Sequence, residues 1–404
     1  MTAPTAKPTP LLRTLSLTQI TLYGIGTILG AGIYVLVGEV ANIAGSFMPL
    51  AFVLAALVVS FSAYSYGHLS RLYPVSAGEP VYVQQAFSLK GLSTLVGYAI
   101  VFAGIVSAAT IARGFSGYFA VFFELADALT ISLLIVLLTA IAAWGVKLSV
   151  SVAIITTLLE LLGLAFVIYA GADKLPALFT NADSPLIPTH LSAWQGVGAG
   201  AFLAFYAFIG FEDMVNMAEE VKQPEKNMPR GILMALLTAC LLYFIVTLCA
   251  LAAVPLQKLA ASKAPLVLVV EHNTAIPVVL MTAISIVAVV NGALLQIIMA
   301  SRVLYGMGKK SMGPRFLATV HPRTRTPLTA TLLVGALVLS AALLAPLVTL
   351  AQATSGTILC IFTLVNLALL RLNWCDQRRD FLALAIPACG AVICAVFLLM
   401  QFWL

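Results

Sequence analysis

The stretch that decides the fold is GIGTILGAGIY, residues 24–34. It lies in an apolar run, yet it holds four glycines within nine residues. Glycine costs up to about 1 kcal/mol relative to alanine inside a helix, so the chain is expected to leave the helix near Gly30, Ala31 and Gly32. In a water-exposed loop such glycines would not indicate a binding site. Their interpretation therefore depends on whether water or lipid surrounds the chain.

The composition of the whole chain indicates that this solvent is a lipid bilayer. Hydrophobic residues make up 62% of the 404 residues and charged residues 9%, against roughly half and a quarter in a soluble domain. Eleven apolar runs of about the length of a membrane-spanning helix follow one another. None shows the alternation of barrel strands, so we expect an all-α integral membrane protein. The predicted spans cover residues 17–45, 47–70, 91–121, 128–146, 149–171, 193–217, 229–254, 275–305, 327–345, 349–370 and 381–404.

The basic residues report the orientation of these spans. The formal net charge is +6, but 17 of the 21 lysines and arginines fall in loops on one side of the membrane if the N-terminus is cytoplasmic. Such an excess marks the cytoplasmic face. The sequence therefore predicts a multi-pass protein of the cell (inner) membrane with residues 1–14 as a cytoplasmic tail. The charge gives no indication of a nucleic-acid partner.

A second broken span is predicted at residues 205–213, which read FYAFIGFED. Gly210 lies near the middle of the sixth span, five spans after the first break. Because five is odd, the two broken segments cross the membrane in opposite directions, which is the geometry of an inverted repeat. The expected parts of the single transmembrane domain, residues 15–404, are repeats at about 15–171 and 193–370 and an extra helix at 381–404.

The broken backbone supplies the chemistry of a binding site. Backbone that leaves a helix at membrane depth must line a cavity or lie buried in protein. The half-helix that starts near Gly30 to Gly32 points N–H groups and a positive dipole end at the break, which suits a carboxylate. Carbonyl groups that end the preceding half-helices suit an ammonium. The predicted substrate-binding residues are Ile25, Gly26, Thr27, Ile28, Leu29, Gly30, Ala31, Gly32, Phe205, Tyr206, Ala207, Phe208 and Gly210.

These features also have plainer interpretations. Glycines in the first span allow close helix packing even without a ligand. Tyr206 and Phe208 wall or gate the pocket in one interpretation and pack in an ordinary core in the other. Glu212, which follows the second break, is expected to cap the second half-helix rather than to touch substrate.

Glu160 is the most isolated charge in the sequence, near the middle of the fifth span. An ionisable residue at this depth is expensive to bury and is by default a functional candidate. One hypothesis makes Glu160 a proton carrier, and the other pairs it structurally with Arg113, the other deep charge. Asn291 in the eighth span is expected either to line the path or to make a packing hydrogen bond.

Neither a metal site nor an enzyme is indicated. The six cysteines and four histidines show no metal-ligand spacing, so no cofactor is expected. A membrane enzyme would need an acidic or histidine cluster at the edge of a span. The nearest acids, Glu219, Glu220 and Glu225, alternate with lysines as in a solvated loop.

Four segments resemble the amino acid/polyamine/organocation (APC) transporter superfamily, most closely its bacterial cationic-amino-acid-transporter-like members. They are GTILGAGIY (26–34), LSRLYPVSAGEPVY (69–82), GFEDMVNMAEEVKQPEKNMP (210–229) and GPRFLATVHPRTRTP (313–327). The resemblance covers roughly residues 15–375. It implies a five-plus-five inverted-repeat (LeuT-like) fold with discontinuous helices 1 and 6, alternating access, and an α-amino acid held between the breaks.

The sequence departs from this superfamily in two places. Members generally have twelve or more spans, so eleven spans leave the contacts between copies, and the oligomeric state, open. Some proton-coupled relatives carry a lysine near the position of Glu160, where a sodium ion sits in sodium-driven cousins. Either Glu160 takes the proton instead, or the protein exchanges one amino acid for another.

The expected function is secondary active transport of an α-amino acid across the plasma membrane, as a proton symporter or as an antiporter. The expected partners are the substrate, the bilayer and, under the coupling hypothesis, protons. A transporter of polyamines or other organic amines and a non-transporting amino acid sensor are the alternatives. The preferred side chain is not predicted.

Overall fold

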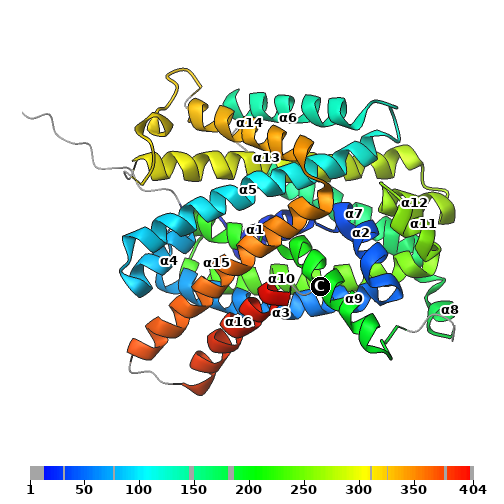
Figure 1. Ribbon diagram of the computed structural model, residues 1–404, viewed down its shortest axis with the longest axis horizontal. Coiled ribbons are helices and arrows are strands. Elements are labelled where there is room, and N and C mark those ends of the chain that lie inside the picture. The colour runs from blue at the N-terminus through cyan, green and yellow to red at the C-terminus, as the bar shows by residue number, and fades with distance from the viewer. Residues whose placement is uncertain are drawn as a thin grey trace, which may run out of the picture.

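The described part of the protein is a bundle of long helices (Figure 1). The computed structural model describes residues 13–30, 32–75, 78–144, 150–180, 186–309, 312–324, 326–376 and 380–400. Within these ranges, the β-structure is one isolated bridge between Leu15 and Val221. Ala31 and residues 1–12 of the predicted tail lie outside the described residues.

Each of the eleven predicted spans coincides with a helix or a broken helix. The spans are, in order, α1 (Leu17–Leu29) with α2 (Ile33–Ala44), α3 (Met48–Leu72), α5 (Lys90–Phe119), α6 (Asp127–Trp144), α7 (Val150–Ala172), α9 (Leu191–Phe205) with the 3-10 helices η2 (Tyr206–Phe208) and η3 (Glu212–Glu220), α10 (Pro224–Ala253), α13 (Val278–Lys309), α14 (Leu328–Leu344), α15 (Leu347–Cys375) and α16 (Phe381–Met400). In the described part of the chain, nine helical stretches are long and apolar enough to cross a membrane, and α1 and α14 are shorter.

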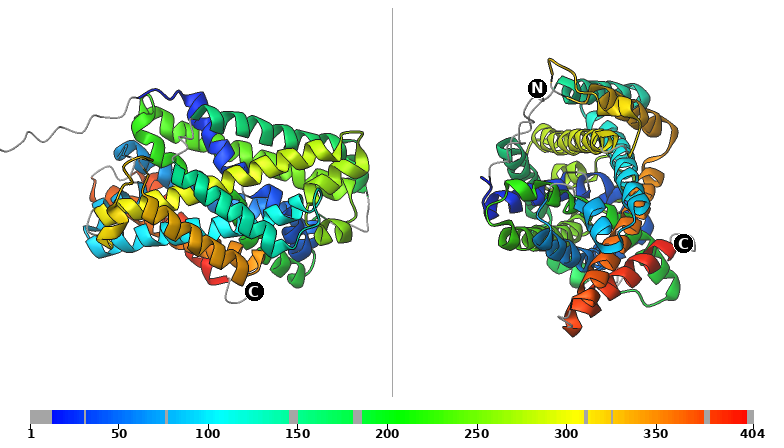
Figure 2. Two further views of the ribbon diagram at one scale, coloured as in Figure 1. Left: turned by 90° about the horizontal axis from the view of Figure 1, so that it is seen from above. Right: turned by 90° about the vertical axis from the view of Figure 1, so that its left-hand side faces the viewer.

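Short helices mark the two ends of the molecule. α4 (Gly78–Phe87) lies at one end, and α8 (Leu175–Thr180), α11 (Leu256–Ala261) and α12 (Pro265–Asn273) lie at the other (Figure 1). Most of the long helices run between these ends, as two further views show (Figure 2). The basic loops predict that the α4 end is cytoplasmic. The remaining short elements are the 3-10 turns η1 (Gly45–Phe47) and η4 (Arg315–Ala318).

Helices of the first four spans pack against the helices five spans later, whereas α7 and α15 of the fifth and tenth spans do not pack along each other. α3 packs along α10, α5 along α13, and α6 along α14. For the first and sixth spans, α2 contacts α9 and α1 contacts η3. Two repeats related by an internal two-fold axis produce such pairs, so the packing agrees with the expected five-plus-five fold. The boundaries of the two repeats stay a prediction.

The break in the first span lies where the glycines predict it. A capping box formed by Ser16 and Gln19 starts α1 and satisfies backbone donors of its first turn. α1 ends at Leu29 and α2 begins at Ile33, and neither Gly30 nor Gly32 belongs to a helix. The two halves of this span are therefore separate elements.

The break in the sixth span is sharper. After the turn η2, the backbone becomes extended at Ile209, and Gly210 follows with a φ of 132°, a region that glycine enters far more readily than other residues. The second half of this span is the 3-10 helix η3. The N–H of Asp213 donates to Gly210 and that of Met214 to Phe211, the tighter hydrogen-bond pattern that defines a 3-10 helix.

Candidate binding site

The two broken spans touch at their glycines. A Cβ atom built on Gly32 would overlap the Cα of Ala207, and one built on Gly210 would overlap the carbonyl group of Thr27. The Thr27 hydroxyl also donates to the carbonyl of Gly210 at 3.0 Å. Close packing, the plainer interpretation of the span 1 glycines, therefore occurs here together with the break.

The free amides of the first span lie at the start of α2. The N–H of Gly30 donates to the carbonyl of Gly26 at 3.0 Å, so both groups are engaged in the last turn of α1. No side chain caps the first turn of α2, which follows Gly32. Uncapped N–H groups of a first helical turn attract anions. The seat for a carboxylate is thus best placed at the start of α2, and Ala31 lies outside the described residues.

Tyr243 of α10 joins the two breaks, and the sequence did not single it out. Its hydroxyl lies 2.9 Å from the carbonyl oxygen of Ile28 and 2.9 Å from that of Ala207. A phenol has one hydrogen to donate, so the two carbonyls share it. Their oxygens therefore converge on one point, as a bound ammonium group requires. A tyrosine in an apolar span gives no sequence signal for this role.

The aromatic residues before the second break are packed or bonded to neighbours. Phe205 lies 5.8 Å from Phe362 and Phe208 lies 5.0 Å from Tyr243, measured between ring centroids. The hydroxyl of Tyr206 lies 2.9 Å from the Ser107 hydroxyl on α5. Core packing, the plainer interpretation, describes both phenylalanines in this structure, and Tyr206 ties the sixth span to α5.

The remaining predicted residues of α1 are buried in the interior of the bundle. Ile25 is 5% exposed, and Ile28 and Leu29 are fully buried. The backbone carbonyl of Ile28 points into the junction of the two spans, where it accepts a hydrogen bond from the Tyr243 hydroxyl. Ile25 and Leu29 therefore pack on neighbouring helices in this structure.

A narrow cavity adjoins the second break. It measures about 20 Å³ and is lined by Ile209, Glu212 and Asp213 together with Ser107 and Glu79. Such a volume holds about one water molecule, which is far less than an amino acid occupies. This cavity therefore does not hold an amino acid in this structure.

Glu212 holds the second break in shape. Its carboxylate accepts a hydrogen bond from the N–H of Gly210 at 2.8 Å, in buried surroundings. The bond satisfies a backbone donor that the break would otherwise leave free. The bond lies before η3, and among the described residues no side chain caps the first turn of η3, so Glu212 braces the break instead of capping the second half of the span as expected.

Glu160 of α7 faces the other side of the first span. Its side chain is fully buried, and neither carboxyl oxygen has a hydrogen-bond partner among the described residues. One oxygen lies 3.2 Å from the position that a Cβ on Gly30 would take, and the carbonyl of Ala288 on α13 lies 3.4 Å from it. Gly32 faces the sixth span and Gly30 faces α7, so the acid lies behind the break.

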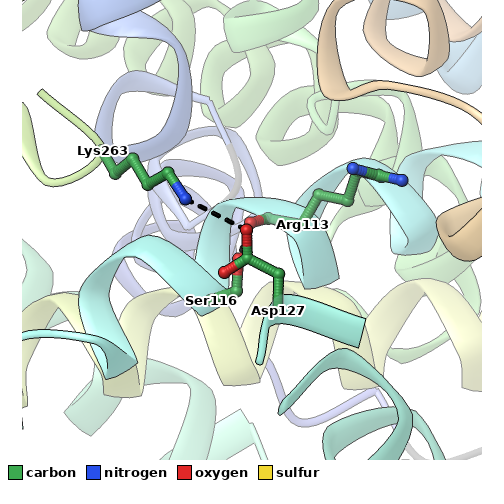
Figure 3. A network of polar contacts seen from close by, with 4 residues as sticks. All are labelled: Arg113, Ser116, Asp127 and Lys263. Atoms are coloured by element: carbon green, nitrogen blue, oxygen red, sulfur yellow. Dashed lines mark hydrogen bonds and ion pairs between the residues drawn. The ribbon is translucent and has the colours of Figure 1, made fainter. Parts of the chain in front are cut away.

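The hypothesis that Arg113 pairs with Glu160 is wrong. Arg113 donates to the carbonyl of Ala342 at 2.6 Å and to that of Leu343, which are free acceptors in the last turn of α14. Among the described residues, the ion pair that forms joins Lys263 to Asp127 at 3.0 Å, and the guanidinium group points away from it (Figure 3).

Asn291 makes a packing hydrogen bond beside Glu160. Its side-chain amide on α13 donates to the hydroxyl of Thr156 on α7 at 3.3 Å. The bond links the two helices that flank the acid. No group of three or more His, Cys, Asp or Glu side chains among the described residues could hold a metal ion.

Comparison with known proteins matches residues 15–404 to the family described as amino acid permease. The chain is 28% identical to cationic amino acid transporter 4, vacuolar, of Arabidopsis thaliana, over 91% of the chain but 64% of that protein, so it spans less than two thirds of this relative's length. It is 30% identical to the branched-chain amino acid permease BcaP of Bacillus subtilis, over 99% of the chain and 90% of that protein. The methylthioribose transporter of the same bacterium is 28% identical, over 97% and 89%.

Proposed function

Because the chain belongs to the amino acid permease family, we propose that it carries an α-amino acid across a membrane by alternating access. Membership confirms the superfamily that the sequence motifs indicated, and with it the transporter fold with two discontinuous helices. The protein is a multi-pass membrane protein, and its family consists of transporters rather than enzymes. The proposal adds the substrate, the way it is held and the energy source.

The convergence of two carbonyl groups on one hydroxyl supports this proposal best. The carbonyls of Ile28 and Ala207 each lie 2.9 Å from the Tyr243 hydroxyl, and the uncapped start of α2 is adjacent in the chain. The substrate ammonium takes the two carbonyls, and its carboxylate takes the amides of α2. An α-amino acid carries both charged groups on one carbon, so it fits this pair of seats.

Glu160 supplies the energy coupling in this proposal. It lies on the opposite side of the span 1 backbone from the substrate seats, with both oxygens buried and unpartnered. An acid at membrane depth is costly to keep ionised and marks proton relays in transporters. A proton on Glu160 and an amino acid at the break thus act on the same short length of backbone.

The cell membrane and a cytoplasmic N-terminus complete the proposal. The basic residues concentrate in loops at the α4 end, which the positive-inside rule places in the cytoplasm.

Uptake by the full chain in liposomes tests the proposal. Labelled amino acids of neutral, cationic and acidic side chains should include at least one substrate, and the matching amine without its carboxylate should compete at least about tenfold less well, because it cannot use the α2 amides. Equal competition by the amine would favour an organic-amine transporter. Binding without uptake would favour a sensor, and folded protein with neither would overturn the proposal.

A further inference from the structure

A buried tyrosine connects the second half of span 1 to the residue that carries the membrane acid. Tyr34 of α2 is fully buried, and its hydroxyl donates to the backbone carbonyl of Glu160 at 2.6 Å. The two residues are 126 positions apart in sequence. The substrate seats described above do not use this phenol, so its contact with α7 needs another explanation.

Gly163 of α7 makes room for this phenol. A Cβ atom built on Gly163 would lie 2.5 Å from the Tyr34 hydroxyl oxygen and 2.8 Å from Ile284 of α13. Any larger residue would push the ring out. Gly163 therefore forms a notch, one helical turn beyond Glu160, in which the Tyr34 hydroxyl sits.

A second phenol holds the first in place. Tyr118 of α5 is fully buried and donates to the backbone carbonyl of Tyr34. The chain of contacts therefore runs from α5 through α2 to α7. Since α2 is a separate helix after the break, these bonds fix its position against α7.

The surroundings of Glu160 contain few groups that could compete for a proton. Tyr34 of α2 and Tyr243 of α10 are the titratable groups that face it from packed helices, with Tyr118 of α5 behind Tyr34. Asn291 of α13 is polar but does not titrate. No ion pair joins Glu160 to a basic side chain among the described residues. Of these groups, Tyr34 is the one that also hydrogen-bonds the backbone of Glu160.

We infer that Tyr34 is the positioning residue that links the movement of α2 to proton access at Glu160. Seated in the Gly163 notch, it seals the carboxyl group from the end that carries α8. When α2 tilts away, the notch empties, and a hydronium ion from that side gives its proton to the carboxylate and leaves as water. The inference rests on the proposed role of Glu160 in coupling.

Tyr34→Phe tests this link, because it keeps the ring in the notch but removes the bond to Glu160. Uptake driven by a pH gradient should fall about fivefold relative to exchange at equal pH, the population shift that the loss of one hydrogen bond produces. The pH profile of uptake should change with it. Tyr98→Phe is the matched control, since Tyr98 also donates to a backbone carbonyl, that of Met312, far from Glu160.

Gly163→Ala provides an independent variant, because it displaces the phenol without removing a polar group. It should lower the ratio of gradient-driven uptake to exchange in the same direction as Tyr34→Phe. It also keeps the test available if Tyr34→Phe does not fold. Equal losses in both assays would mean a merely structural role and would overturn the inference.

Glu160→Gln separates this inference from the proposal beneath it. If the gradient dependence of the wild-type protein survives in Glu160→Gln, the coupling proposal fails. If Glu160→Gln abolishes that dependence while Tyr34→Phe and Gly163→Ala keep the wild-type ratio, only the role of Tyr34 is refuted. Amino acid transport itself is judged by the exchange assay, which needs no gradient.

Discussion

The two faces of the span 1 break differ in how their polar groups are satisfied. On the face toward the sixth span, the carbonyls of Ile28 and Ala207 share the hydroxyl of Tyr243. On the face toward α7, both oxygens of Glu160 are buried and have no hydrogen-bond partner within the described part of the chain. The first face stays satisfied without substrate, whereas the second keeps a group for an exchangeable proton. Both faces belong to one short backbone segment. A displacement of the backbone on one face therefore also moves the backbone on the other.

A methyl group added at Gly32, on the face toward the sixth span, should have the largest effect on uptake. In Gly32→Ala, the new Cβ would overlap Ala207, so the two breaks cannot meet and uptake should fall to background. Gly306→Ala on α13 is the matched control, because no atom lies within 4 Å of a Cβ there, and it should transport normally. Wild-type uptake by Gly32→Ala would show that the contact of the two breaks is dispensable.

Removing the exchangeable proton should disable the second face alone. Glu160→Gln keeps the shape of the side chain, so exchange at equal pH should persist while uptake loses its dependence on a pH gradient. The measurement compares the two assays in one liposome preparation. If Glu160→Gln also loses exchange, Glu160 belongs to the substrate site. The two faces would then not have separate functions.

Tyr243→Phe tests whether the Tyr243 hydroxyl competes with the substrate for the two carbonyls of the first face. The variant frees the two carbonyls for the substrate ammonium, and the loss of one competing hydrogen bond should lower the KM for exchange about fivefold. Tyr98→Phe again serves as the control for a lost bond to a carbonyl. A raised KM would mean that the Tyr243 hydroxyl helps to hold the substrate instead of standing in for it.

Substitution of Glu79 should have the smallest effect on uptake. This buried acid differs from Glu160 in having a hydrogen-bond partner. It lies on α4, outside the spans, and accepts a hydrogen bond from Tyr66 at 3.0 Å. Burial raises the pKa of Glu79 from 4.5 to about 7. Between these two pKa values the folded protein keeps a proton that the unfolded chain releases. The free energy of unfolding therefore falls as pH rises, by up to about 1.4 kcal/mol per pH unit.

Glu79→Gln should therefore flatten the change in thermal stability between pH 4.5 and 7. Melting in detergent across this range measures it. The gradient dependence of uptake should stay at the wild-type level, because this acid has a structural partner. If Glu79→Gln removes the gradient dependence, the coupling acid lies at the α4 end rather than behind the break.

The positions of both breaks could be predicted because helix disruption is a local property. Gly30, Gly32 and Gly210 sit in apolar runs, and glycine weakens a helix wherever it occurs. The bond between Glu212 and the N–H of Gly210 is equally local, since the two residues are two positions apart. Contacts within a few residues follow from the order of the chain.

The failed pairing of Glu160 with Arg113 shows where such reasoning ends. Both residues are deep charges, but depth in a span does not say which way a side chain faces. Arg113 instead satisfies carbonyls at the end of α14, 229 and 230 positions away. Choosing between these acceptors requires the packing of α5 against its neighbours.

The sequence by itself determined the membrane environment, the eleven spans, the two breaks and the family, because hydropathy, glycine content and motifs are properties of short segments. The tertiary structure alone decided that Tyr243 bridges the breaks, that Glu160 lies behind one of them and that Tyr34 bonds the backbone of Glu160. Each of these contacts joins residues at least 36 positions apart. Their geometry depends on how whole helices pack, which no local pattern records.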